Sequence, residues 1–121
     1  MKRPKWSGSV YTLRYGKIKV EGGRGILKLS RGNKCKTTGY LSKMMLEKAD
    51  SWIIEGDEPF NQTNALCELL TMINGGGRNI EIHLKSHTYD YETLRSISKT
   101  DEILDMCTTF TDRSGKRFGG I

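Results

Sequence analysis

The feature that most constrains this chain is a glycine-rich turn between two segments of alternating apolar and polar residues. Residues 9–20 alternate like a strand, and a one-residue slip at Gly16 aligns the apolar side chains on one face: Tyr11, Leu13, Tyr15, Ile18 and Val20. Residues 21–24 have turn chemistry because glycine adopts positive φ without strain, and residues 26–29 return as a second strand. The sequence therefore predicts an antiparallel hairpin with a bulge at Gly16.

Helical periodicity governs the middle of the chain. Thr37 or Thr38 can cap a helix whose apolar positions recur at helical spacing as far as Ile53. A second helix is expected from about residue 61 to residue 73, where a run of three glycines ends it. Residues 80–85 then alternate, which predicts a half-buried strand.

Two further helices are expected after that strand. One starts near residue 88 or 90, and the last follows a predicted capping box at residues 98–101 and extends to Phe110. The fold class predicted is two-layer α+β, in which the N-terminal antiparallel hairpin and one further strand pack against about four helices. We expect a single domain over residues 1–112, with a basic N-terminal arm at 1–8 and a flexible basic tail at 113–121.

The charge distribution carries the main functional indication. Residues 1–48 contain thirteen of the twenty Lys and Arg residues but only two of the fourteen acids, and the net charge is +6. Such a split favours a surface that faces a polyanion, although the two halves of the chain can instead neutralise each other. The predicted nucleic-acid-binding residues are the following: Lys2, Arg3, Lys5, Trp6, Arg14, Lys17, Lys19, Arg24, Lys28, Arg31, Lys34, Lys36, Lys116 and Arg117. Among the aromatics, Trp6 is the stacking candidate, because Tyr11 is expected to face the core.

Other chemistry has weaker support in the sequence. His83 and His87 have Asp90 and Glu92 nearby, but no third ligand has the spacing of a zinc site, so no metal site is predicted. The glycines around Arg24 can cradle a phosphate, but a plain hairpin turn is the favoured explanation. No catalytic residue and no cofactor are predicted. Three scattered cysteines and the absence of a signal-peptide pattern favour reduced thiols and a cytoplasmic location.

Residues 63–69 and 80–86 resemble the centre of the ribonuclease H fold. That family places a Thr-Asn pair and a Glu on its first helix, matched here by Thr63, Asn64 and Glu68, and an Asp-Ser pair at the end of the next strand. Lys85 stands where that Asp is expected, and the first strand carries no Asp. Two-metal chemistry needs several carboxylates, so the resemblance implies a related fold whose nuclease activity is lost.

Three functional hypotheses follow. The first is a non-enzymatic domain that binds DNA or RNA, or associates with nucleoprotein, through its basic hairpin. The second is a small phage or mobile-element protein that binds and inhibits a host protein or nucleoprotein enzyme through that partner's acidic surface. The third is a degenerate ribonuclease H-like nuclease. No membrane partner is expected, since no stretch approaches the roughly 18 apolar residues of a membrane span, and a homo-oligomer is left open.

Overall fold

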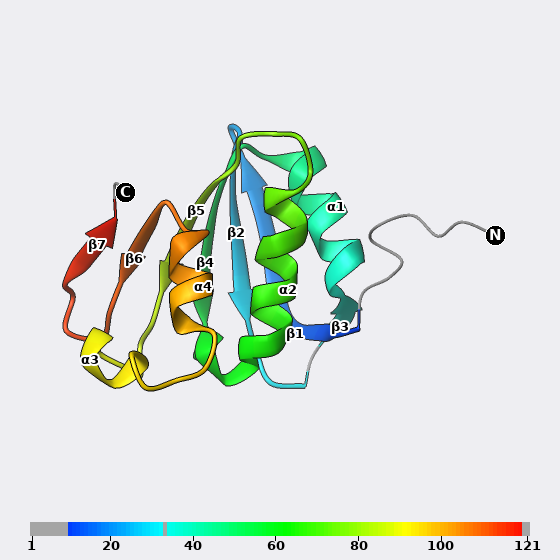
Figure 1. Ribbon diagram of the computed structural model, residues 1–121. Coiled ribbons are helices and arrows are strands. Elements are labelled where there is room, and N and C mark those ends of the chain that lie inside the picture. The colour runs from blue at the N-terminus through cyan, green and yellow to red at the C-terminus, as the bar shows by residue number, and fades with distance from the viewer. Residues whose placement is uncertain (1–9, 33, 120–121) are drawn as a thin grey trace.

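The computed structural model describes residues 10–32 and 34–119, which form one sheet and the helices that cover it (Figure 1). The strand order is β3-β1-β2-β4-β5-β6-β7. The strands are β1 (Thr12–Glu21), β2 (Arg24–Leu29), β3 (Lys34–Thr37), β4 (Ser51–Gly56), β5 (Glu81–Lys85), β6 (Thr109–Thr111) and β7 (Arg117–Gly119). The helices are α1 (Thr38–Lys48), α2 (Thr63–Asn74), α3 (Tyr91–Leu94) and α4 (Thr100–Asp105), with a 3₁₀ turn η2 (Pro59–Gln62) before α2.

The predicted N-terminal hairpin is confirmed, including its bulge. β1 and β2 pair antiparallel, and the register shifts between Tyr15 and Lys17. After the shift Ile18 pairs with the buried Leu27, so Ile18 returns to the face that carries Leu13. A side chain is excluded at Gly16, since a Cβ there would lie 2.8 Å from the Ser30 Cβ. The slip inferred from the apolar pattern is thus a real irregularity of the ladder.

The prediction that the first helix extends as far as Ile53 is wrong, because residues 51–56 form a strand. Helix α1 begins after Thr37, one of the two predicted caps, whose hydroxyl accepts from the Tyr40 N–H, and it ends at Lys48. The segment around Trp52 and Ile53 is instead β4, parallel to β2 on one side and to β5 on the other. A buried parallel strand is nearly continuous in apolar residues, so a short run of this kind fits a helix and a strand equally well.

The C-terminal part needs a second correction. Residues 109–111 and 117–119 form β6 and β7, where a helix end and a tail were expected, and β3 forms at residues 34–37, where no strand was predicted. The predicted capping box at 98–101 is wrong, because the residue before α4 is Lys99, in the left-handed region at φ 69°, and it makes no side-chain cap. Over the described residues the class is mixed α and β with four helices, as expected, but the sheet is much larger than a hairpin plus one strand.

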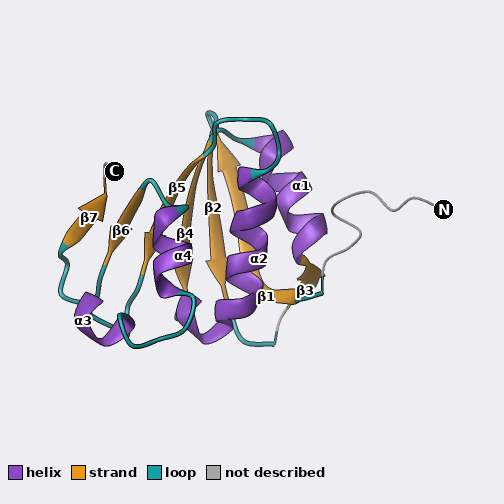
Figure 2. Ribbon diagram, in the orientation of Figure 1, coloured by secondary structure: helices purple, strands orange, loops and turns teal. Residues whose placement is uncertain are grey.

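Helices α1, α2 and α4 lie on the same side of the sheet (Figures 1 and 2). Strands β2, β4, β5 and β6 are parallel and succeed one another in a single direction across the sheet. Crossovers between parallel strands are right-handed, so a strand order that advances in one direction places every connecting helix on one face. The chain topology therefore dictates a one-sided helical layer.

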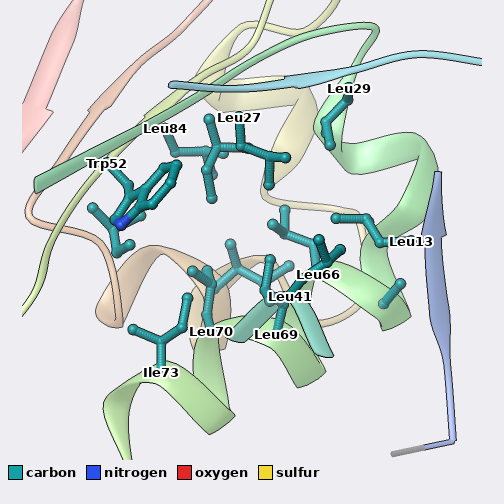
Figure 3. Close-up of a cluster of buried hydrophobic side chains, with 14 of the residues drawn as sticks. Leu13, Leu27, Leu29, Leu41, Trp52, Leu66, Leu69, Leu70, Ile73 and Leu84 are labelled. Atoms are coloured by element: carbon teal, nitrogen blue, oxygen red, sulfur yellow. The ribbon is translucent and has the colours of Figure 1, made fainter. Parts of the chain in front are cut away.

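The hydrophobic core fills the space between this helical layer and the sheet (Figure 3). Leu13, Leu27 and Leu84 from the strands meet Leu41 of α1 and Leu66 of α2, and all five are fully buried. Trp52 is also fully buried, and its indole N–H donates to the Met45 carbonyl at 3.0 Å. The core thus joins β4 to the last turns of α1.

The structure also bears on the thiols and on membrane insertion. Cys35, Cys67 and Cys107 are all free, with Cys35 exposed and Cys67 buried. Burial raises the pKa of Cys107 to about 12.

In the part of the chain that the structure describes, none of the helices has the length and apolar character needed to cross a membrane.

Candidate functional site

The side of the sheet away from the helices carries the candidate site. Along β4, Trp52 and Ile54 face the core, whereas Ser51, Ile53 and Glu55 alternate onto the other side. We call this second side the open face, and it is built by these residues: Lys17, Lys19, Glu21, Arg24, Ile26, Lys28, Ser51, Ile53, Glu55, Glu81, His83, Lys85, Thr109, Thr111 and Arg117. Parallel strands are usually covered on both faces, so an open face suits contact with another molecule.

One row of side chains crosses the open face from β1 to β7 and is mainly cationic. Register pairs Lys17 with Lys28 and Lys28 with Glu55, and further along it pairs Lys85 with Thr111 and Thr111 with Arg117. Glu55 joins the two parts, because its carboxylate lies 3.7 Å from the Lys85 ammonium. With strands about 4.8 Å apart, this cationic row spans about 24 Å.

Glu55 fixes the centre of the cationic row. Its carboxylate lies 3.9 Å from the Lys28 Nζ and 3.7 Å from the Lys85 Nζ, while the Glu55 side chain is only 22% exposed. One acid therefore serves two ammonium groups, and the row keeps a positive excess. Both lysine side chains remain about half exposed, so their charges stay available to a ligand in solvent.

A second row lies about 6–7 Å further along the strands, two residues away from the first. This middle row contains a cation, two apolar residues, an imidazole and a hydroxyl: Lys19, Ile26, Ile53, His83 and Thr109. The His83 ring is held at both nitrogens, since Nδ1 lies 2.7 Å from the Thr109 Oγ1 and Nε2 lies 3.3 Å from a Glu81 carboxylate oxygen. The ring is thus fixed across the β5–β6 boundary.

A third row completes the open face at the starts of the parallel strands. This lower row consists of Glu21, Arg24, Ser51 and Glu81. Its character differs from that of the cationic row, because two of its four members are acids. Along the strands the face therefore changes from a mainly cationic row, through apolar groups and an imidazole, to a row of mixed charge.

The three rows meet in a hollow of about 720 Å³ over β4 to β7. The residues that line it include Lys85 and Arg117 of the cationic row, Ile53 and His83 of the middle row, and Glu81 of the lower row. The turn at residues 22–25 forms one rim. The volume falls within the range of roughly 300–1,000 Å³ that ligand sites occupy.

The structure brings six of the predicted binding residues onto this side of the sheet. They are Arg14, Lys17, Lys19, Arg24, Lys28 and Arg117. Arg14 belongs with them because it alternates with the buried Leu13 and Tyr15, and its guanidinium therefore emerges on the side away from the helices.

The other predicted binding residues do not join this group. Lys34 and Lys36 project toward the helix side of the sheet, above the rings of Tyr15 and Tyr40 at 6.0 and 5.1 Å. Lys116 lies 5.3 Å above the Phe118 ring, and Arg31 is exposed beyond the end of β2. The remaining four lie outside the described residues: Lys2, Arg3, Lys5 and Trp6.

Sequence reasoning missed several members of the face. Lys85 was noticed only as a missing carboxylate, and Glu55 was placed near the end of a helix, so neither was assigned to a site. His83 was considered only as a metal ligand, and its side chain is 24% exposed on this face. The alternation at 81, 83 and 85 could have pointed to a shared surface, but the strands beside it were not predicted.

Glu68, the carboxylate singled out by the ribonuclease H resemblance, lies on α2 and serves the backbone. Its oxygens accept from the N–H groups of Val10 and Tyr11 at 3.1 Å and from the Thr38 hydroxyl. Burial acts to raise the pKa of Glu68, but these hydrogen bonds outweigh it and hold the pKa below its usual value. Glu68 belongs to the helical layer, whereas Lys85 lies on the open face, so the sheet separates the two.

Two buried carboxylates organise the loops at the other ends of the parallel strands. Glu58 accepts from the Ser86 hydroxyl at 2.6 Å and from the Thr88 N–H at 2.9 Å. Asp112 accepts from the Ser114 hydroxyl at 2.6 Å and the Tyr91 N–H at 3.1 Å, and the Ser114 bond is the main cause that lowers the pKa of Asp112. Both acids are occupied by hydrogen bonds to the chain itself, which assigns them to loop structure.

Comparisons with protein-family models, with curated proteins and with solved structures found no match.

Proposed function

We propose that this chain is a non-enzymatic nucleic-acid-binding domain and that the open face is its binding surface. The observation that carries the proposal is the cationic row, in which Lys17, Lys28, Lys85 and Arg117 follow one another across the sheet with Glu55 as the single acid among them. A regular line of cations on an open surface matches a chain of phosphates, which supply regularly spaced negative charges.

The charges on this face are available for binding. Within the described ranges, Lys17, Lys19, Arg24 and Arg117 form no salt bridge, and all four residues are exposed. Among the described residues of this face, acids neutralise lysines only in the pairs that Glu55 makes with Lys28 and Lys85.

A second copy of the chain suits the open face less well than a polyanion does. Two such faces packed with their strands in the same direction would bring the cationic rows together, and like charges at a desolvated interface cost several kcal/mol. The apolar part, Ile26 and Ile53, is only half buried and small, so it offers little of the apolar area on which a stable dimer depends. Charge complementarity thus favours an acidic ligand.

The test is a salt-dependent titration of a labelled oligonucleotide of about 30 nucleotides, single- and double-stranded, from about 50 to 300 mM salt. Roughly 4–6 phosphate contacts predict micromolar or tighter binding at low salt and a log–log slope near −3 to −5. The variant Lys17→Glu/Lys19→Glu/Arg117→Glu is expected to weaken every sequence alike and to flatten the slope by about 2, because phosphate contacts carry no base information.

The matched control reverses three cations that lie off the open face: Lys34→Glu/Lys36→Glu/Lys116→Glu. Net charge changes equally in both triple variants, so an effect of overall charge would appear in both. Equal losses would contradict the assignment of the open face. No measurable binding at the lowest salt would refute nucleic-acid binding and favour the inhibitor hypothesis, in which the same face docks on an acidic protein.

A further inference from the structure

We propose that the hollow of the open face holds one unpaired base of a single strand and favours a base that carries an exocyclic amino group. This inference rests on the proposed function and goes further, because it assigns sequence discrimination to a surface whose cations read only the backbone. The residues that carry it are Ile53, His83 and Glu81, which line the hollow beside Lys85 and Arg117.

The order of the three rows matches the order of groups in a nucleotide. A nucleotide presents an anionic phosphate, then a flat base, and finally the polar edge of that base. Across the hollow, Lys85 and Arg117 lie in the cationic row, Ile53 and His83 in the middle row, and Glu81 in the lower row. A phosphate on the first row therefore directs the attached base over the second and its edge toward the third.

The middle row is suited to stacking. Ile53 and His83 are direct register partners on β4 and β5, and Ile26 continues the apolar surface on β2. Both nitrogens of His83 are engaged, by Thr109 and by Glu81, so the ring is already ordered before a ligand arrives. An ordered ring beside an aliphatic side chain stacks on a base with little loss of side-chain entropy.

Glu81 supplies the discrimination, because it lies on the same strand as His83, whereas Arg24, which also lines the hollow, lies two strands away on β2. Its side chain is 61% exposed, and only its Oε1 approaches His83, at 3.3 Å. An ionised carboxylate accepts hydrogen bonds and donates none. It therefore attracts the amino group of cytosine, adenine or guanine and repels the carbonyl that uracil or thymine presents at the equivalent position.

A duplex does not fit this site, because its base faces are stacked on one another and its Watson–Crick edges are paired. The hollow is open along the sheet, so a strand that follows the cationic row can place one base in it without a sharp turn of the backbone. The proposed ligand is therefore a single strand with one base in the hollow, flanked by backbone contacts that are independent of sequence.

The test compares two oligodeoxynucleotides of about 12 nucleotides, one of cytosine and one of uracil, at neutral pH and low salt. The two bases differ at the amino or carbonyl group on C4 and at the protonation of N3. Wild-type protein is expected to bind the cytosine oligomer about tenfold more tightly, the value of one hydrogen bond to a charged group. Glu81→Gln is expected to reduce this ratio to about twofold or less, because an amide can also donate.

Glu21→Gln is the matched control, since Glu21 belongs to the same lower row but is not part of the hollow. Removing either acid strengthens backbone binding electrostatically, and the Glu21 variant is expected to keep the tenfold ratio. His83→Ala is expected to weaken the cytosine oligomer roughly tenfold, and His83→Phe to restore it, because a flat ring is what stacking requires. Unfolding midpoints check that each variant is folded.

The outcomes separate this inference from the proposed function. Equal wild-type affinity for the two oligomers, with a steep salt dependence for both, overturns base discrimination and leaves backbone binding in place. An unchanged ratio in Glu81→Gln, or a His83→Phe variant as weak as His83→Ala, likewise overturns the roles assigned to these two residues. Failure of both oligomers to bind wild-type protein overturns the single-strand inference, and the proposed function is refuted only if the longer single- and double-stranded oligonucleotides of the salt titration also fail to bind.

Discussion

At the scale of single residues, close contacts with a neighbouring strand or side chain explain why glycine occupies two positions in the central strands. Gly56 ends β4 at φ 103°, and a Cβ there would lie 2.5 Å from the Leu29 carbonyl oxygen. A Cβ at Gly25 would approach the Trp52 ring to 2.4 Å. These two glycines allow the close approach of a neighbouring strand and of a large aromatic side chain. The turn residues Gly22 and Gly23 differ, because a Cβ at either position would meet no atom within 4 Å.

Gly56→Ala is therefore expected to destabilise the fold more than Gly22→Ala. Both positions have positive φ, so both substitutions add strain of about 1 kcal/mol, but only Gly56 also faces backbone atoms that cannot move aside. The total for Gly56→Ala is expected to exceed about 3 kcal/mol. Urea unfolding of the two variants measures the difference, and equal free energies of unfolding would contradict the packing explanation.

At the scale of elements, the loops after β4 and β6 are each organised by one carboxylate. Glu58 binds the segment after β5, through the Ser86 hydroxyl and the Thr88 N–H. Asp112 binds the turn between β6 and β7, through the Ser114 hydroxyl and the N–H of Lys116, and it also reaches Tyr91 at the start of α3. The connections after β4, β5 and β6 thus depend on hydrogen bonds to carboxylates as well as on the strand ladders.

The pH dependence of stability follows from the direction of the Asp112 shift. Because the folded pKa lies below the ordinary value, ionised Asp112 stabilises the fold above that ordinary value, and the contribution is lost as pH falls toward the folded pKa. Asp112→Asn is expected to be less stable than wild type near neutral pH, with the difference shrinking below about pH 4.

Urea unfolding at several pH values measures this effect. Asp57→Asn, an exposed acid on the connection between β4 and η2, is the charge-matched control. A gap between wild type and Asp112→Asn that stays constant down to the lowest pH would show that the hydrogen bonds of Asp112 do not depend on its charge.

At the scale of the whole molecule, strand order decides where the chemistry of this chain lies. The parallel strands advance in one direction, so right-handed crossovers place α1, α2 and α4 on one side and leave the graded open face on the other. Carboxylates that the sequence places close together, such as Glu68 on α2 and Glu81 on β5, come to lie on opposite sides of the sheet.

This separation predicts that the pure protein does not cleave DNA, RNA or a hybrid with Mg²⁺ or Mn²⁺. Two-metal chemistry needs several carboxylates around one point, and the Glu68 carboxylate is already occupied by Val10, Tyr11 and Thr38. Glu68→Gln is expected to lower stability by about 1 kcal/mol instead. Reproducible cleavage by wild type that is abolished in Glu68→Gln would overturn this assignment.

The sequence by itself determined the features that depend on neighbouring residues. The hairpin with its bulge at Gly16, the cap at Thr37 and the end of α2 in a glycine run are all local, because φ preferences and side-chain alternation set them. The excess of cations in the first 48 residues was also evident, although not which of them lie together.

Only the tertiary structure decided β4, the two C-terminal strands and the composition of the open face. The apolar run around Trp52 satisfies both helical and strand spacing, and pairing with β2 and β5 selects the strand, through hydrogen bonds to residues far away in sequence. The same non-local pairing puts Lys17 of β1 in one row with Arg117 of β7, 100 positions later in the sequence. Local propensity depends on neighbouring residues and carries no information on strand partners far away in sequence. The cationic row therefore could not be derived before the strand order was known.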